Sequence, residues 1–183
     1  ATGMKNEKHG SLMRHEMAYV LGQLRDERAC PPLEDVLRND KDCVMVRHET
    51  AEALGAIGAV RSQSVLEEIV ERYPGRPELS DTCRLALNVM EWRMNGGDAD
   101  DAPAACACML NPYSSVDPAP PHPSHATKSP KELGDILCDP DLPIFERYRA
   151  MFSLRNLGGS ANVEQLCRAL MSDTSSALLR HEV

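Results

Sequence analysis

Aromatic residues are scarce in this sequence, at 4% of 183 residues, whereas alanine and leucine are frequent. A low aromatic content with many small aliphatic residues favours closely packed helices over a β-sandwich. Basic residues do not predominate either, because the formal net charge is -8 at pH 7. Phosphate binding needs clustered lysine and arginine, so no nucleic acid partner is expected. A basic or polyamine-like substrate suits this charge better.

Two further absences concern the location of the protein. No apolar run is long enough to span a membrane, and no N-terminal apolar segment has the pattern of a signal peptide. The seven cysteines are odd in number and irregularly spaced, so they do not indicate a disulfide framework. We therefore expect a cytoplasmic protein in a reducing environment, with no membrane partner.

An internal repeat with a period of 33 residues organises the chain. The tripeptide Arg-His-Glu at residues 14–16 recurs at residues 47–49, and the same offset aligns Leu21 with Leu54. Each unit carries two apolar segments with helical periodicity. Two prolines at residues 31–32 open the second segment, and a helix tolerates proline in its first turn. Helix pairs of this length are the unit of HEAT-like solenoids.

The repeat predicts an all-α fold of HEAT-like helical hairpins, an α-solenoid in two lobes joined by a proline-rich linker. Residues 1–95 are expected to form the N-terminal lobe, with two His-Glu pairs, and residues 131–183 part of a C-terminal lobe, with one. Residues 96–130 hold seven of the 13 prolines and are expected to be a flexible linker. The expected helices lie near residues 11–24, 30–38, 44–57, 62–72, 78–94, 143–157 and 160–172.

The Arg-His-Glu motif occurs a third time, at residues 180–182, again in repeat register. Six histidines would give fewer than one His-Glu pair by chance, yet three are present. Duplication of a surface pair would also explain the recurrence. However, Asp81-Thr82 and Tyr148-Arg149 stand at the same repeat position, so the scaffold does not require His-Glu. The other three histidines lie outside this register and are expected to be exposed to solvent: His9, His122 and His125.

Helix geometry suggests how such pairs would bind metal. Adjacent residues of a helix project about 100° apart, so one helix cannot easily aim both side chains at a single ion. It offers the imidazole to one ion and the carboxylate to a neighbouring ion. Nitrogen and carboxylate ligands without cysteine suit iron or manganese. Two histidines and one carboxylate with open positions are typical of non-haem Fe(II) oxygenases.

The segments that carry these motifs resemble deoxyhypusine hydroxylase. Residues 13–23 and 46–58 are similar to its first two metal helices, and residues 178–183 to the start of its third. Residues 145–155 are similar to the repeat without a metal pair that opens its second lobe. The resemblance implies a deoxyhypusine monooxygenase, an oxidoreductase that uses O₂ at a di-iron centre. Its partner would be the deoxyhypusine form of translation initiation factor 5A, hydroxylated to hypusine.

The resemblance also implies the cofactor, Fe(2+) with two ions per complete site, and the site residues. His15 and His48 would bind one iron together with Glu182, whereas His181 and Glu16 would bind the second. Glu49 would line the site and contact the cationic substrate as the catalytic residue, and it is also a candidate ligand. The candidate metal ligands are therefore the six side chains of the three pairs: His15, Glu16, His48, Glu49, His181 and Glu182.

The family has a fourth His-Glu pair, one repeat after His181, and a capping repeat before His15. We therefore expect this chain to be truncated at both ends, and to be less stable and less active than its parent. Two other classes stay open, namely a non-catalytic helical-repeat scaffold that binds proteins and a bilin lyase. Metal content distinguishes them, because a scaffold needs no iron and a bilin lyase needs a tetrapyrrole. The sequence does not give the oligomeric state.

Overall fold

The structure is a computed structural model that describes residues 3–4, 6, 8–97, 111–172 and 176–183. In these ranges the chain forms helices and no strands, as predicted. It divides into two compact units, residues 1–95 and 96–183, which are taken separately below. No helix in the described ranges is both long and apolar enough to cross a membrane.

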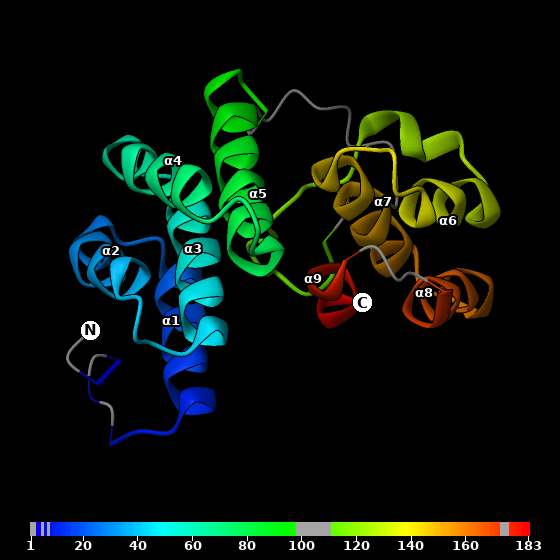
Figure 1. The fold of residues 1–183 in the computed structure, drawn as a ribbon. Coiled ribbons are helices and arrows are strands. Elements are labelled where there is room, and N and C mark those ends of the chain that lie inside the picture. Colours follow the sequence, from blue (N-terminus) through cyan, green and yellow to red (C-terminus); the bar gives the residue numbers. More distant parts are fainter. Residues whose placement is uncertain (1–2, 5, 7, 98–110, 173–175) are drawn as a thin grey trace. The chain divides into compact units, whose positions relative to one another are not determined.

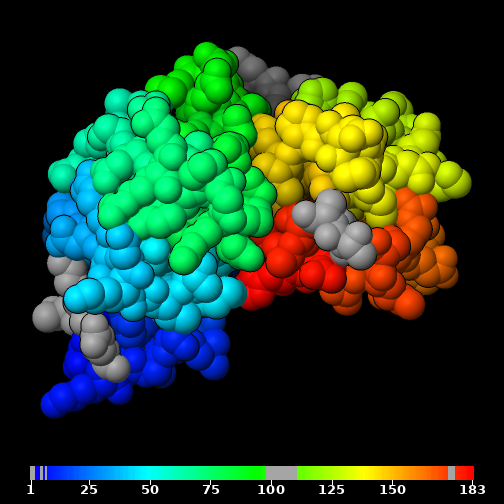
Figure 2. All heavy atoms as spheres, in the orientation of Figure 1, coloured from blue at the N-terminus to red at the C-terminus, as the bar shows by residue number. Residues whose placement is uncertain are grey.

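The first unit consists of two helical hairpins and one further long helix (Figure 1). The helices α1, α3 and α5 lie side by side, with α3 in contact with both of the others, and α2 and α4 pack against this row. The side chains of α3, α4 and α5, cyan to green in Figure 2, close into a continuous surface. All five helices predicted for this unit are confirmed, with ends within one residue: α1 (Ser11–Leu24), α2 (Cys30–Arg38), α3 (Val44–Ile57), α4 (Gln63–Arg72) and α5 (Pro77–Met94), with short 3₁₀ turns η1 (Glu27–Ala29) and η2 (Val60–Ser62).

Local sequence explains where α2 begins and where α3 ends. Pro31 and Pro32 stand in the first turn of α2, where a missing N–H has no helical partner. Gly58 ends α3 in a left-handed conformation with φ of 73°, and its N–H donates to the carbonyl of Leu54 at 2.9 Å. Glycine adopts this conformation without the steric cost of a Cβ. The result is a helix of fourteen residues at the centre of the unit, with His48 in its second turn.

Two glycines set the spacing of the row of helices. A Cβ on Gly22 of α1 would lie 2.8 Å from the Cα of Ala53 in α3. A Cβ on Gly55 of α3 would lie 2.8 Å from the Cα of Ala86 in α5. Both distances are shorter than van der Waals contact, so only glycine allows these backbones to approach so closely. The close approach brings side chains of three different helices within reach of one another.

The arginine of the Arg-His-Glu motif has a structural role. Arg47 Nε donates to the carbonyl of Leu37, at the end of the preceding helix, at 2.9 Å. In the second unit Arg147 Nε donates to the carbonyl of Leu137 at the same distance and sequence separation. Both arginines are buried. Arg147 keeps this role where Tyr148-Arg149 replaces His-Glu, so the arginine anchors the repeat independently of the two residues that follow it.

Replacing Arg47 by methionine should lower the free energy of unfolding by about 2–3 kcal/mol, because a hydrogen bond from a buried charged group is lost. The measurement is urea denaturation followed by circular dichroism. Arg84→Met is the matched control, since Arg84 forms a part-exposed ion pair with Asp81 that is worth about 0–1 kcal/mol. Equal effects of the two substitutions would contradict the anchoring role.

The second unit contains one helix that was not predicted. Its elements are η4 (Pro123–Thr127), α6 (Pro130–Cys138), α7 (Ile144–Leu157), α8 (Ser160–Ser172) and α9 (Ala177–Glu182). The predictions of α7 and α8 are confirmed, whereas α6 begins at the edge of the predicted linker. Ser129 and Glu132 form a reciprocal capping box at its start, with Pro130 in the first turn. These start signals, together with the apolar stripe that follows them, are a sequence signature from which the helix could have been predicted.

The part of the predicted linker that the structure describes packs against α7. Arg149, at the glutamate position of the repeat, is buried and donates from Nε to the carbonyl of Pro120 at 2.9 Å. Arg155 pairs with both carboxylate oxygens of Asp117, at 3.0 and 2.6 Å. Because proline has no N–H, a proline-rich segment depends on donors such as these. Residues 111–129, part of the flexible linker predicted over 96–130, therefore contact α7 through these side chains. Residues 98–110 lie outside the described residues, and the linker stays a prediction.

The expectation that His125 is exposed is wrong. The residue is 4% exposed, and its Nδ1 lies 2.7 Å from Oγ of Ser153 in α7. Burial lowers the pKa of His125 to about 4, so the side chain is neutral at pH 7. His122, 5.7 Å away between ring centroids, is partly buried, and burial lowers its pKa as well. These histidines belong to the packing of the proline-rich segment.

Candidate metal centre

Three of the six predicted site residues come together in the first unit, on α1 and α3. His15 Nε2 lies 3.1 Å from Oε2 of Glu49, and the rings of His15 and His48 are 6.3 Å apart between centroids. His48 and Glu49 are 1% and 4% exposed. The side chain of His15 is 17% exposed. The repeat register thus places two imidazoles and one carboxylate at the same interface between helices.

Glu52 joins this group, although it was not predicted. One donor atom from each of His48, Glu49 and Glu52 lies within 4.8 Å of the others. Glu52 stands four residues after His48, on the same face of α3, and this spacing was a signal in the sequence. Glu49 is buried and Glu52 is partly buried, and a bound cation would stabilise their ionised carboxylates. Nitrogen and oxygen donors without cysteine fit a hard or borderline ion such as iron or manganese.

Glu16 occupies a different environment from Glu49. Its side chain is 57% exposed, and its Oε1 lies 3.2 Å from Nδ1 of His15. Glu16 thus points away from the buried group, as expected for adjacent helix residues that project about 100° apart. On α3 the two side chains diverge less, because the flexible Glu49 side chain brings its carboxylate within 4.8 Å of the donor atom of His48. Sequence spacing alone does not fix the direction of a side chain with three rotatable bonds.

The third pair stands on α9 of the second unit. His181 Nε2 and Glu182 Oε1 are 4.0 Å apart, and the side chains are 45% and 18% exposed. Burial raises the pKa of the Glu182 carboxyl to about 7. A bound cation would oppose this shift, because it favours the ionised form. The sharing of iron between this pair and the pairs of the first unit stays a prediction.

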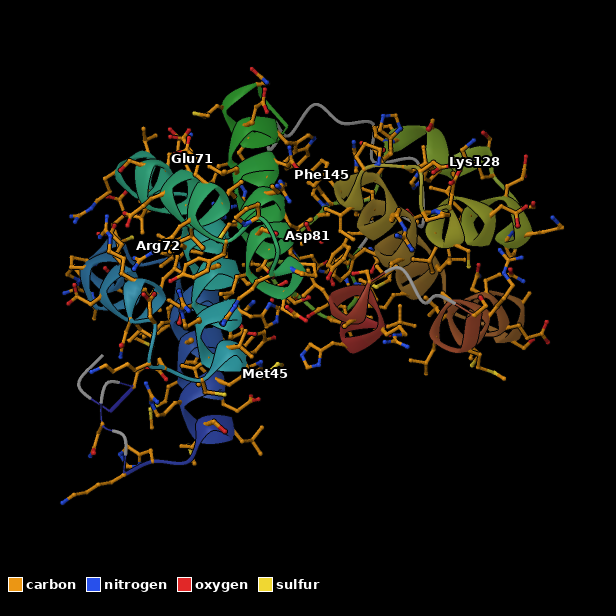
Figure 3. The ribbon with its side chains drawn as sticks, viewed as in Figure 1. Met45, Glu71, Arg72, Asp81, Lys128 and Phe145 are labelled. Atoms are coloured by element: carbon orange, nitrogen blue, oxygen red, sulfur yellow. The ribbon has the colours of Figure 1, made fainter. Side chains whose placement is uncertain are left out.

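One further contact in the first unit involves Thr82, which in the sequence is only a departure from the His-Glu motif. His48 Nδ1 lies 2.9 Å from Oγ1 of Thr82, a fully buried residue of α5. Thr82 stands 33 residues after Glu49, so the repeat register places it at the glutamate position of the third repeat. The neighbouring Asp81, labelled on α5 in Figure 3, takes the histidine position and pairs instead with Arg84 at 2.9 Å.

Comparisons with known proteins identify repeats and relatives over most of the chain. The HEAT repeat pattern matches residues 8–79, and the pattern of the PBS lyase HEAT-like repeat matches residues 146–170. The deoxyhypusine hydroxylase of Danio rerio is 48% identical over 179 residues, which cover 94% of this chain and 53% of the relative. The Dictyostelium discoideum enzyme of the same name is 48% identical over 97% of this chain and 53% of its own length.

A solved structure of human deoxyhypusine hydroxylase in complex with glycerol matches with a TM-score of 0.81 and 42% identity. The match covers 96% of this chain and 56% of the human chain. The chain belongs to the deoxyhypusine hydroxylase family. The family resemblance and the HEAT-repeat fold predicted from the sequence are thereby confirmed. The chain spans about half the length of the curated deoxyhypusine hydroxylases that it matches.

Proposed function

We propose that this chain is part of a di-iron monooxygenase that hydroxylates the deoxyhypusine side chain of translation initiation factor 5A to hypusine. The observation that supports the proposal most is the buried group formed by His15, His48 and Glu49 in a chain related to the deoxyhypusine hydroxylases. A helical-repeat scaffold that only binds proteins has no need of buried imidazoles and carboxylates gathered at one interface.

The residues proposed to hold the metal come from the three His-Glu pairs. His15 and His48 would hold one Fe(2+) together with Glu182, and His181 and Glu16 would hold the second. When bound, the iron pair supplies the activation of O₂. Nitrogen and carboxylate donors of the kind present in the first unit suit that metal. Burial of His48 and Glu49 also keeps water away from the place where the reaction occurs.

The proposed reaction breaks one C–H bond of the substrate and forms a C–OH group with one oxygen atom of O₂. The second oxygen atom leaves as water, with two electrons from an added reductant and two protons. The substrate side chain carries amines that are cationic at pH 7. Glu49 and the net charge of -8 favour its binding electrostatically. Glu49 would therefore hold an amine while the carbon that reacts faces the metal.

The test supplies the iron-loaded protein with O₂, a reductant and the deoxyhypusine form of initiation factor 5A. The expected product carries one additional oxygen atom on that side chain, detected by mass spectrometry of the digested factor. Omission of O₂ or of iron should abolish the gain. A protein that binds the factor tightly but takes up no iron would be a scaffold, and the proposal would be wrong.

Replacing Glu49 by glutamine should weaken binding of the deoxyhypusine factor about tenfold or more, while most of the iron is retained. The physical reason is that the substitution removes a negative charge but keeps the shape and an oxygen donor. Binding is measured by calorimetry and iron by elemental analysis. Glu67→Gln, on the exposed face of α4, removes the same charge away from the group and is the control. Loss of iron before loss of substrate binding would make Glu49 a metal ligand instead.

A further inference from the structure

The interface between α3 and α5 contains a hydrogen bond whose direction follows from the chemistry of its partners. Thr82 Oγ1 lies 2.9 Å from His48 Nδ1 and 2.8 Å from the carbonyl oxygen of Glu78, one turn earlier in α5. A carbonyl oxygen only accepts, and a threonine hydroxyl has a single hydrogen. The hydroxyl therefore donates to Glu78, and it accepts from Nδ1–H of His48.

This direction fixes the tautomer of the histidine. With the proton on Nδ1, the electron pair of the neutral imidazole lies on Nε2, which is the atom that can coordinate a metal. Histidines that bind metals in proteins almost always donate their other ring N–H to a nearby acceptor, which also holds the ring in orientation. Thr82 is fully buried and cannot easily leave this position. The close approach of α3 and α5 at Gly55 and Ala86 holds the two residues together.

We propose that Thr82 is a positioning residue of the site, which holds His48 as the Nδ1–H tautomer and so presents Nε2 to the metal. The inference rests on the proposed function insofar as it names metal as the partner of Nε2. The hydrogen bond itself is a property of the metal-free chain. At the glutamate position of the third repeat the side chain is thus a hydroxyl and not a carboxylate. This hydroxyl accepts a hydrogen bond from the histidine of the preceding repeat, His48.

The first test measures the tautomer directly in the metal-free chain of 183 residues. Nitrogen-15 NMR of the histidine side chains, at a pH where the imidazole is neutral, should show His48 protonated on Nδ1. Thr82→Ser should keep this pattern, because the hydroxyl is retained. Thr82→Val, which has nearly the same shape, should shift His48 towards the Nε2–H form. An Nε2–H pattern in the unaltered chain, or no response to Thr82→Val, would overturn the inference.

A matched control is available on α3. Thr50 is also fully buried, and its hydroxyl donates to the carbonyl of Val46, one turn earlier, at 2.7 Å. Thr50→Val removes the same kind of back-bond within a helix, but the hydroxyl that it deletes is not the one that contacts His48. The His48 tautomer should be unchanged in this variant. A change as large as that in Thr82→Val would show a general effect of the lost back-bond and would overturn the specific role.

The second test titrates the same variants with Co(II), whose visible absorption reports ligand binding. Thr82→Val should weaken binding by about 10- to 100-fold, as is typical for loss of the outer partner of a metal-binding histidine. Thr82→Ser should restore affinity close to that of the unaltered chain. Unchanged affinity in Thr82→Val would overturn the positioning role. Failure of the unaltered chain to bind Co(II) or Fe(II), with the Nδ1–H tautomer present, would count against the proposed function and support the hydrogen bond.

Discussion

Replacing His48 by alanine is expected to remove most of one equivalent of iron from the metal-loaded protein. His48 is 1% exposed and belongs both to the group with Glu49 and Glu52 and to the contact with Thr82. Loss of its imidazole removes a nitrogen donor that neighbouring side chains cannot replace. The measurement is elemental analysis after removal of loosely bound metal. Because bound metal stabilises only the folded state, the rise in melting temperature on addition of iron should also become smaller.

His9→Ala is the control for this prediction, since His9 is exposed and lies outside the repeat register. Its iron content should equal that of the unaltered protein. Circular dichroism in the absence of metal should show that both variants are folded. An unchanged iron content in the folded His48→Ala protein would show that His48 is not a ligand, and the proposed centre would then have to be abandoned.

Replacing Gly55 by valine is expected to lower the free energy of unfolding of the first unit by about 3 kcal/mol. A Cβ at this position would meet both the Cα and the Cβ of Ala86 at 2.8 Å, and backbone atoms cannot move aside without separating α3 from α5. Urea denaturation measures the loss. Separation of these helices should also lengthen the contact between Thr82 and His48, so Co(II) affinity should fall with stability.

Gly75→Val is the matched control, because no atom lies within 4 Å of a Cβ built at Gly75 and its φ is not in the left-handed region. Its effect should stay within about 0.5 kcal/mol, as for most surface substitutions. Reduced entropy of the unfolded chain would stabilise both variants, so a similar loss in both would mean that the valine side chain itself, and not helix spacing, accounts for the effect. The close approach of α3 and α5 would then have no special importance for the site.

Most of the fold could be predicted from the sequence because the repeat supplies two independent signals. Helical periodicity gives each element, and the 33-residue register shows which elements are equivalent. Helix α6 does not follow from composition, because its capping box at Ser129 lies inside a proline-rich stretch that is typical of linkers. The packing of His125 could not be predicted, since it depends on tertiary contacts with Ser153 that leave no periodic trace.

The candidate site was predicted in part for a similar reason. His15, His48 and Glu49 share the repeat register, and the structure places them together. Glu52 belongs to the group because of its position on the helix face, which the tripeptide motif does not include. Thr82 was recognised only as a departure from the motif. Its hydroxyl matters because of the residue across the interface, and a pattern read along one helix does not reveal that partner.

The anchoring arginine has a consequence for which positions of the repeat can vary. Because Arg47 and Arg147 bind the preceding helix in the same way, this contact does not depend on which two residues follow the arginine. The two following positions can therefore carry different side chains while the arginine contact is kept. One repeat has an imidazole and a carboxylate there, at His48 and Glu49. Another has Tyr148 and Arg149, of which Arg149 fastens the proline-rich segment. The repeat thus combines a constant contact with two variable positions, and the same scaffold can present different side chains at the same place.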